Sequence, residues 1–252
     1  MQLPALPAPL AWGLAASAAL CAAALAVLAC LCAWSAIDRV ANRAGGGPVM
    51  VVLGSGGHSA EMTALLRAVL VPSGREDDDL DTEEARAWFR ESQRLYVIAE
   101  TDTGSATKAK ALEADVRKQA VARGAGKSGR AGGFEILRIP RSREVHQSYV
   151  SSVATTLRST LHALHLVLRH RPAAVVANGP GTCLPVCLCA AALSWLRVQP
   201  CKVIFFESIC RVSTLSLTAK IVRLLRAADP LLVQWEEAAQ LHPGCVFRGR
   251  VY

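Results

Sequence analysis

The sequence is poor in aromatic residues, contains no N-glycosylation sequon and shows no regular spacing of cysteines. Aromatic residues make up 5% of the 252 residues, but hydrophobic residues make up 52%, which excludes a globally disordered chain. Neither Asn42 nor Asn178 is followed by the Ser or Thr that a sequon needs. The nine cysteines are odd in number and lie mostly in apolar runs, which argues against a secreted disulfide framework and favours a reducing compartment.

Charged side chains are also absent from the first 37 residues. Residues 10–37 form an apolar run with Trp12 and Trp34 near its ends. As a helix this run would be about 42 Å long, enough to cross a hydrocarbon core of about 30 Å. A cleaved signal peptide, with a small-x-small site at 33–35, is the alternative, but its basic n-region is missing and the run is too long. We therefore expect an uncleaved transmembrane anchor over residues 10–37.

The first charges after this run predict the orientation of the chain. Arg39 and Arg43 follow the apolar residues closely. Basic residues flanking a transmembrane helix favour the cytosolic side. We expect a lumenal N-terminus over 1–9, a hinge over 38–48 and a cytosolic domain over 49–252.

Short apolar runs alternate with helical patterns throughout this domain. Apolar runs without polar alternation are typical of strands buried on both faces of a parallel sheet, and they lie at 49–53, 95–99, 134–139, 173–177, 202–206 and 231–234, with a further candidate at 245–247. Helical patterns lie at 60–70, 106–119, 150–168, 184–196 and 215–227, of which the third has a single apolar stripe formed by Val150, Val153, Leu157, Leu161, Leu164 and Leu168. The alternation predicts an α/β fold with a Rossmann-like, doubly wound parallel sheet.

Two polar insertions interrupt this order, near 73–94 and near 120–133. The first holds eight of the twenty acidic residues and four basic ones, so the rest of the chain carries a net charge of +12. The second is rich in Arg, Lys and Gly and is expected to be a flexible basic loop. Because no interleaved aromatics or binding motif accompany these charges, we expect no nucleic-acid partner and favour anionic membrane headgroups.

The most informative motif is a glycine-rich turn between the first predicted strand and helix, Gly54-Ser55-Gly56-Gly57-His58. Glycines let a ligand approach the backbone, and the helix start offers free N–H groups, so the turn predicts a phosphate cradle. A dinucleotide site is weakly supported, because Ser59 stands where its fingerprint needs Gly. A turn required only for packing is the other alternative. His58 argues against it, since a histidine beside a cradle can hold a ligand or move a proton.

Other polar residues follow predicted strands and should gather at the same edge of the sheet. A second glycine turn follows 173–177, and its candidate ligand contacts are Asn178, Gly179, Gly181 and Thr182. Glu207 follows 202–206, and Arg141 and Arg143 follow 134–139. The two guanidiniums can bind a phosphate in a bidentate way. A surface ion pair with Glu144 is an equally good interpretation of these arginines.

Three closely spaced cysteines raise the question of a metal site. They are Cys183, Cys187 and Cys189, and their neighbours are apolar. We interpret them as buried thiols rather than ligands. No metal and no cofactor are expected.

Several motifs together resemble one family. The segments GSGGH, YVIAETD, RIPRSREV, NGPGTC and ESICR occur in this order behind a predicted anchor. They resemble the asparagine-linked glycosylation protein 14 family, the membrane subunit of the dolichol-linked UDP-N-acetylglucosamine transferase. The resemblance extends from Val49 to the C-terminus, and is more distant to the N-terminal half of the bacterial muramyl-pentapeptide N-acetylglucosaminyltransferase.

The resemblance implies half of an enzyme, namely the acceptor-side Rossmann domain of a GT-B glycosyltransferase. A soluble catalytic subunit of the asparagine-linked glycosylation protein 13 family would bind UDP-N-acetylglucosamine. The complex would add the second N-acetylglucosamine to N-acetylglucosaminyl-diphospho-dolichol at the cytosolic face of the endoplasmic reticulum membrane. The two glycine turns and arginines would then bind the acceptor diphosphate, His58 (as a base) and Glu207 would be the catalytic candidates, and the C-terminal residues Arg250, Val251 and Tyr252 would contact the partner.

Two rival hypotheses remain at this stage. A self-sufficient glycosyltransferase is disfavoured, because about 200 residues after the anchor hold one Rossmann domain and a GT-B enzyme needs two. A non-catalytic membrane recruiter with relic glycine loops predicts that loop substitutions are tolerated. The role of the C-terminal segment also has two alternatives, since 245–252 can bind a partner or supply a last strand to the same sheet.

Overall fold

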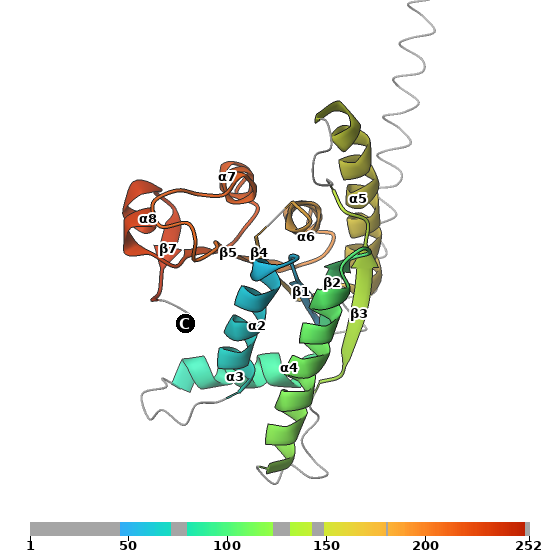
Figure 1. The fold of residues 1–252 in the computed structure, drawn as a ribbon, viewed down its shortest axis with the longest axis vertical. Coiled ribbons are helices and arrows are strands. Elements are labelled where there is room, and N and C mark those ends of the chain that lie inside the picture. Colours follow the sequence, from blue (N-terminus) through green and yellow to red (C-terminus); the bar gives the residue numbers. More distant parts are fainter. Residues whose placement is uncertain (1–45, 72–79, 123–131, 143–148, 180, 250–252) are drawn as a thin grey trace, which may run out of the picture.

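The computed structural model describes residues 46–71, 80–122, 132–142, 149–179 and 181–249 (Figure 1). The predicted anchor over 10–37, Arg143 and the segment 250–252 lie outside the described residues. In the part of the chain that is described, no helix is both long enough and apolar enough to cross a membrane. The transmembrane anchor over 10–37 therefore stays a prediction.

Seven parallel strands form one sheet in the described residues. Their order across the sheet is β3-β2-β1-β4-β5-β6-β7. The strands are β1 (Val49–Val52), β2 (Arg94–Ala99), β3 (Phe134–Ile139), β4 (Ala174–Asn178), β5 (Lys202–Phe206), β6 (Leu231–Val233) and β7 (Cys245–Phe247). The predicted doubly wound parallel sheet is confirmed. β7 pairs with β6, so residues 245–247 do supply a last strand to the same sheet.

The central strands are continuous apolar runs because both faces of the sheet are covered. Every residue of β1 is buried, with Met50 and Val52 in the core on one face and Val49 and Val51 in the core on the other. β1 pairs in register with 94–97 of β2 and 174–177 of β4. A polar residue placed in the middle of these strands would have no route to water, which explains the missing alternation.

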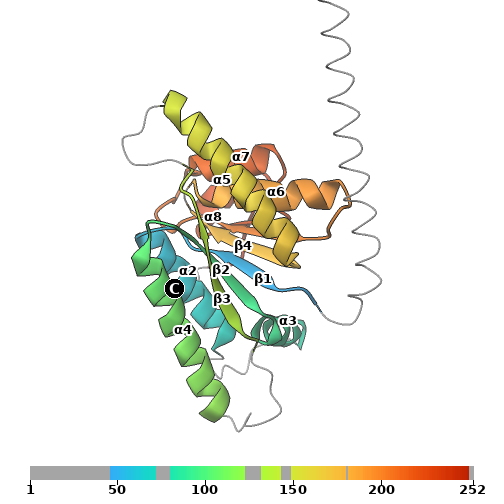
Figure 2. The same cartoon turned by 90° about the vertical axis from the view of Figure 1, so that its right-hand side faces the viewer.

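Helices cover the two faces in separate layers. They are α2 (Gly57–Leu70), α3 (Leu80–Glu91), α4 (Thr103–Ala122), α5 (Tyr149–His170), α6 (Cys183–Trp195), α7 (Leu217–Leu224) and α8 (Glu236–Leu241). One core cluster joins α5, α6, α7 and α8 to the sheet, and the other joins α2 and α4 to its opposite face. Figure 2 shows α5, α6 and α7 on one side of the sheet and α2 and α4 on the other.

The apolar stripe predicted for α5 is only partly its buried face. Leu164 and Leu168 pack against the core, but Leu157 and Leu161 are each 60% exposed. The fully buried apolar residues are instead Ala163 and Val167. A helix of 22 residues is about 33 Å long, roughly twice the length of a five-residue strand, so its first half has less sheet to cover.

The predicted acidic insertion contains α3 and ends in the core. Arg94 was placed in the polar insertion, but it begins β2 and is 1% exposed. Its Nε and Nη2 donate to the two oxygens of Glu113 on α4, at 2.6 and 2.9 Å, and Tyr96 donates to Glu113 Oε1 at 2.6 Å. Desolvation alone would lower the pKa of Arg94, but the Glu113 carboxylate raises it on balance. The charge is tolerated inside because it is paired and fully hydrogen-bonded.

Candidate functional site

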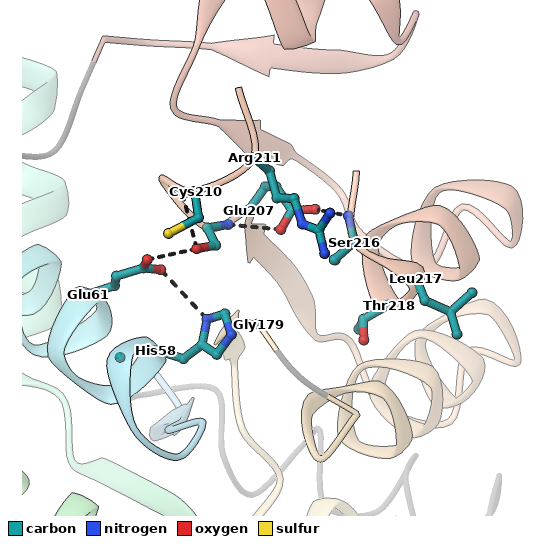
Figure 3. A pocket seen from close by; sticks show the side chains of 11 residues that line it. His58, Glu61, Gly179, Glu207, Cys210, Arg211, Ser216, Leu217 and Thr218 are labelled. Atoms are coloured by element: carbon teal, nitrogen blue, oxygen red, sulfur yellow. Dashed lines mark hydrogen bonds and ion pairs between the residues drawn. The ribbon is translucent and has the colours of Figure 1, made fainter. Parts of the chain in front are cut away.

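The first three strands extend the sheet in one direction from β1, and the later strands extend it in the other direction from β4. A hollow of about 500 Å³ opens at the carboxyl ends of β1 and β4, where this direction changes. The connection after β1 leads to α2 on one face, and that after β4 leads to α6 on the other. Such a switch point is where open α/β sheets bind ligands. Four segments line the hollow (Figure 3), through Gly57, His58, Glu61, Gly179, Glu207, Ser208, Cys210, Arg211, Ser216, Leu217 and Thr218.

The first glycine turn is held in a conformation that favours glycine. Gly56 has a φ of 69°, and no side chain caps the start of α2. Lys108 on α4 donates to the Gly56 carbonyl at 3.0 Å and to Ser59 Oγ at 2.8 Å. Ser105 Oγ, which donates to Asp102 at 2.7 Å, also lies 3.2 Å from the Gly54 carbonyl oxygen. The first glycine turn is therefore held in place by a side chain of α4, a contribution that the sequence analysis did not identify.

The second glycine turn lies against the histidine of the first. Gly179 has a φ of 94°, and a Cβ atom added to it would clash with the His58 imidazole. Asn178, at the end of β4, lies with its Oδ1 3.2 Å from His58 Nδ1. The two turns therefore lie side by side at one hollow, as predicted. Pro180, between Gly179 and Gly181, lies outside the described residues.

A carboxylate that the sequence analysis missed connects the two turns with the segment after β5. Asn178 Nδ2 donates to Glu61 Oε2 at 3.0 Å, and Ser208 Oγ donates to Glu61 Oε1 at 2.7 Å. Glu61 Oε2 also lies 3.7 Å from His58 Nδ1. The signal available in the sequence was the spacing, because residues three apart on a helix share a face.

Glu207 lies in the wall of the hollow and is 1% exposed. One carboxylate oxygen accepts from the backbone N–H of Ser208 at 2.9 Å, and the other accepts from that of Ser216 at 2.8 Å. These bonds hold the two ends of the segment 208–216 together. The geometry makes Glu207 a residue that shapes the loop, and its predicted catalytic role stays a prediction.

Arg211 is the exposed cation of the hollow. It extends from the loop shaped by Glu207 and contacts Thr214 Oγ1 at 3.4 Å. Among the described residues it has no ion-pair partner. This arginine was in the ESICR segment noted in the sequence but was not predicted as a ligand contact.

Arg141 was predicted to bind phosphate, and it lies at the same edge of the sheet without lining the hollow. Its charge acts on Asp102, which precedes α4. Burial alone would raise the pKa of Asp102, but hydrogen bonds from Ser105 and the charge of Arg141 lower it on balance. The neighbouring Ser142 donates to the Gly181 carbonyl at 3.2 Å, which ties this segment to the second turn. Thr182 lies directly before α6 and makes no side-chain cap there.

The cysteines of α6 are buried, as predicted. Burial raises the pKa of Cys183 to about 12 and that of Cys189 to about 11. Within the described ranges no group of three or more His, Cys, Asp or Glu residues is arranged to hold a metal ion. By contrast, Cys210 is exposed at the hollow.

Alkylation of the native protein should therefore discriminate between these thiols. Iodoacetamide is expected to modify Cys210 and to leave Cys183, Cys187, Cys189 and Cys201 unmodified, because reaction needs an accessible thiolate. Peptide mass spectrometry after a timed quench measures the modified fraction at each position. In denaturant all five should react, and rapid native labelling of the four buried thiols would contradict the described packing.

The fold and the hollow define a Rossmann-like α/β protein with a candidate ligand site at the switch point of its sheet. The sequence model of the family described as "Oligosaccharide biosynthesis protein Alg14 like" matches residues 49–251. The chain belongs to this family.

Curated relatives agree with this assignment. The mouse and human proteins named "UDP-N-acetylglucosamine transferase subunit ALG14" are 39% and 38% identical over 203 residues, covering 81% of this chain and 82% of theirs. The protein of the same name from Yarrowia lipolytica is 33% identical over 201 residues, 80% of this chain and 79% of its own. Among solved structures, MurG of Acinetobacter baumannii is similar with a TM-score of 0.45 and 14% identity, and the chain covers 44% of its length while 81% of this chain is matched.

Proposed function

We propose that this chain is the membrane-anchoring, acceptor-binding subunit of a heteromeric UDP-N-acetylglucosamine transferase. In this proposal it binds N-acetylglucosaminyl-diphospho-dolichol at the endoplasmic reticulum membrane and recruits a soluble subunit that binds the sugar nucleotide. The complex then adds the second N-acetylglucosamine of the lipid-linked oligosaccharide used in protein N-glycosylation. The observation that carries the proposal is the meeting of the two glycine turns around the hollow, in a family whose relatives are named transferase subunits.

A diphosphate fits the chemistry of this hollow. The first turn of α2 contains no acidic residue and has no side-chain cap, so its backbone N–H groups and the positive end of the helix dipole are available to an anion. The carboxylates of Glu61 and Glu207 accept hydrogen bonds from their neighbours, while Arg211 supplies a positive charge. The diphosphate of a lipid-linked sugar would place the sugar beside His58, which could take a proton from the attacking hydroxyl.

Reconstitution tests whether this chain and a soluble partner are both required for sugar transfer. The full chain, a soluble partner that binds UDP-N-acetylglucosamine, or both are added to liposomes that contain N-acetylglucosaminyl-diphospho-dolichol, and transfer of labelled sugar is measured. Product is expected only from the mixture. Transfer by this chain alone would refute the half-enzyme proposal, and a mixture that assembles but makes no product would favour a recruiter without an acceptor site.

The orientation in the membrane has its own test. With the anchor over 10–37 and basic residues after it, protease added to sealed microsomes is expected to digest residues 49–252, because the body faces the outside of the vesicle. Immunoblotting of residues 49–252, with a lumenal protein as the control, measures how much of this domain survives the protease. Protection of the body until detergent is added would contradict the predicted topology.

The C-terminus is proposed to contact the partner. Deleting Arg250–Tyr252 is expected to lower recovery of the partner from membranes, while the sheet stays intact because β7 ends at Phe247. Co-purification measures recovery, and thermal unfolding of the deleted chain is the control. Unchanged recovery would assign partner binding to another surface.

A further inference from the structure

The wall of the hollow contains a chain of hydrogen bonds that ends at His58. It runs from Ser208 through Glu61 and Asn178 to the imidazole. The Glu61 side chain is 13% exposed, whereas that of His58 is 33% exposed. The carboxylate is thus the sheltered end of the chain and the imidazole is the end that a ligand can reach.

Glu61 decides which way the Asn178 amide is oriented. A carboxylate is only an acceptor, so the amide atom 3.0 Å from Glu61 Oε2 must be the NH₂ group. The opposite orientation would place two acceptor oxygens at that distance. The carbonyl oxygen of Asn178 is therefore the atom that faces His58 Nδ1, at 3.2 Å.

The oriented amide in turn decides where the imidazole proton resides. Asn178 Oδ1 and Glu61 Oε2 are the two oxygens near Nδ1, and both are acceptors, so Nδ1 must carry the hydrogen. In the neutral ring Nε2 is then the unprotonated nitrogen. His58 lines the hollow, and Figure 3 shows Nδ1 on the side of Glu61 and the second ring nitrogen turned away from Glu61.

Two further contacts keep the ring in this position. Gly179 passes so close to the imidazole that any side chain there would displace it. Ser208 donates to the second oxygen of Glu61 at 2.7 Å and lies directly after Glu207, whose carboxylate shapes the loop. The position of the imidazole is therefore coupled to the loop that carries Arg211.

From this geometry we infer that Glu61 is a positioning residue, which acts through Asn178 to hold neutral His58 in the Nδ1–H tautomer with Nε2 as the acceptor in the hollow. The consequence for sugar transfer rests on the proposed function. If an acceptor hydroxyl lies in the hollow, its proton passes to Nε2 as its oxygen bonds to the sugar carbon, while the nucleotide diphosphate leaves with the bonding electrons. The other tautomer would present an N–H at the same place and could not accept this proton.

Nitrogen NMR tests the tautomer directly and without any activity. Full-length chain labelled with ¹⁵N-histidine is compared at about pH 8, where an ordinary imidazole is neutral, with a His58→Gln variant that assigns the signal among the six histidines. The wild type is expected to show the Nδ1–H form. The Nε2–H form or an imidazolium in the wild type would overturn the inference.

Three variants separate the hydrogen-bonding role of Glu61 from its charge and from packing. Glu61→Met removes both acceptors at similar size and is expected to lose the Nδ1–H preference. Glu61→Gln keeps an oxygen for Asn178 and an NH₂ group for Ser208 Oγ, so it should retain the tautomer. Glu237→Met, on an exposed position of α8, is the matched control and should change nothing. An unchanged tautomer in Glu61→Met would overturn the inference, as would its loss in Glu61→Gln.

Turnover of the reconstituted complex is the second readout. Glu61→Met is expected to lose transfer by about 10²–10⁴-fold, like His58→Ala, with acceptor KM changed less than kcat, whereas Glu61→Gln stays within about tenfold of the wild type. Full turnover in a Glu61→Met variant that has lost the tautomer would overturn the positioning role. Absence of transfer by the wild-type complex would count against the proposed function and leave the NMR result intact.

Discussion

Replacing Gly57 by valine is expected to abolish sugar transfer by the reconstituted complex while the domain stays folded. Gly57 lines the hollow, its φ lies outside the left-handed region, and a Cβ atom there meets no atom within 4 Å. A Cβ atom is therefore accommodated, and the valine side chain occupies the space above the start of α2 where a diphosphate would approach. Since displacement of a substrate by about 1 Å can cost 100-fold, we expect turnover to fall by at least about 100-fold.

A second glycine provides the matched control. Gly133 precedes β3 at the opposite edge of the sheet, is exposed and also has open space around its Cβ position. Gly133→Val is therefore expected to leave turnover unchanged, and both variants should retain the wild-type circular dichroism and unfolding temperature. If Gly57→Val transferred sugar at the wild-type rate, the turn would be needed only for packing and the recruiter hypothesis would gain support.

Replacing Glu113 by leucine is expected to lower the free energy of unfolding by about 3–5 kcal/mol. The substitution leaves the guanidinium of Arg94 buried beside an apolar side chain and removes the acceptor of the Tyr96 hydroxyl. Burial, together with the Glu113 charge, raises the pKa of Tyr96, so the phenol stays protonated and needs an acceptor. Urea denaturation of residues 46–252, if that segment folds when expressed alone, or of the full chain in detergent, measures the change.

Two comparisons make this result interpretable. Asp115→Ala breaks the 2.8 Å pair that Asp115 on α4 makes with Arg67 on α2, but both partners are partly exposed, so the loss should be below about 1 kcal/mol. The double variant Arg94→Met with Glu113→Leu should lose less than the sum of the two single variants, because each single variant leaves a buried unpaired charge and the double variant leaves none. Additive losses would contradict a coupled buried pair.

The predicted and observed sites differ in a way that follows from the range of the interactions. His58, Gly57 and Gly179 were predicted because a strand, a glycine turn and a helix start are adjacent in the sequence. Glu61 was missed because its partners are distant, Asn178 by 117 residues and Ser208 by 147. Lys108 was missed for the same reason, since it braces the turn at Gly56 from 52 residues away.

The α5 helix shows the same limit for packing. Its 3.6-residue periodicity predicted a helix with one apolar face; the helix is confirmed, but Leu157 and Leu161 on that face are exposed. Periodicity reports that apolar side chains share a face, but whether that face is covered depends on how far the neighbouring sheet and α6 extend. Arg94 is the converse case. This charged residue lies in a polar stretch of the sequence, yet it is buried in the core because the carboxylate of Glu113 pairs with it.

The sequence by itself determined the order of the strands and of five of the helices, the parallel doubly wound sheet and the membership of the family, because buried apolar runs and glycine turns are local patterns. Only the tertiary structure decided that the turns after β1 and β4 meet at the switch point and that Glu61 orients Asn178 towards His58. The tertiary structure also decided that the buried carboxylate of Glu207 and the buried guanidinium of Arg94 each find hydrogen-bond partners. These contacts join segments that become neighbours when parallel strands pair in a non-sequential order. Hydrogen bonds act over about 3 Å, so their partners are determined by that pairing and not by spacing along the chain.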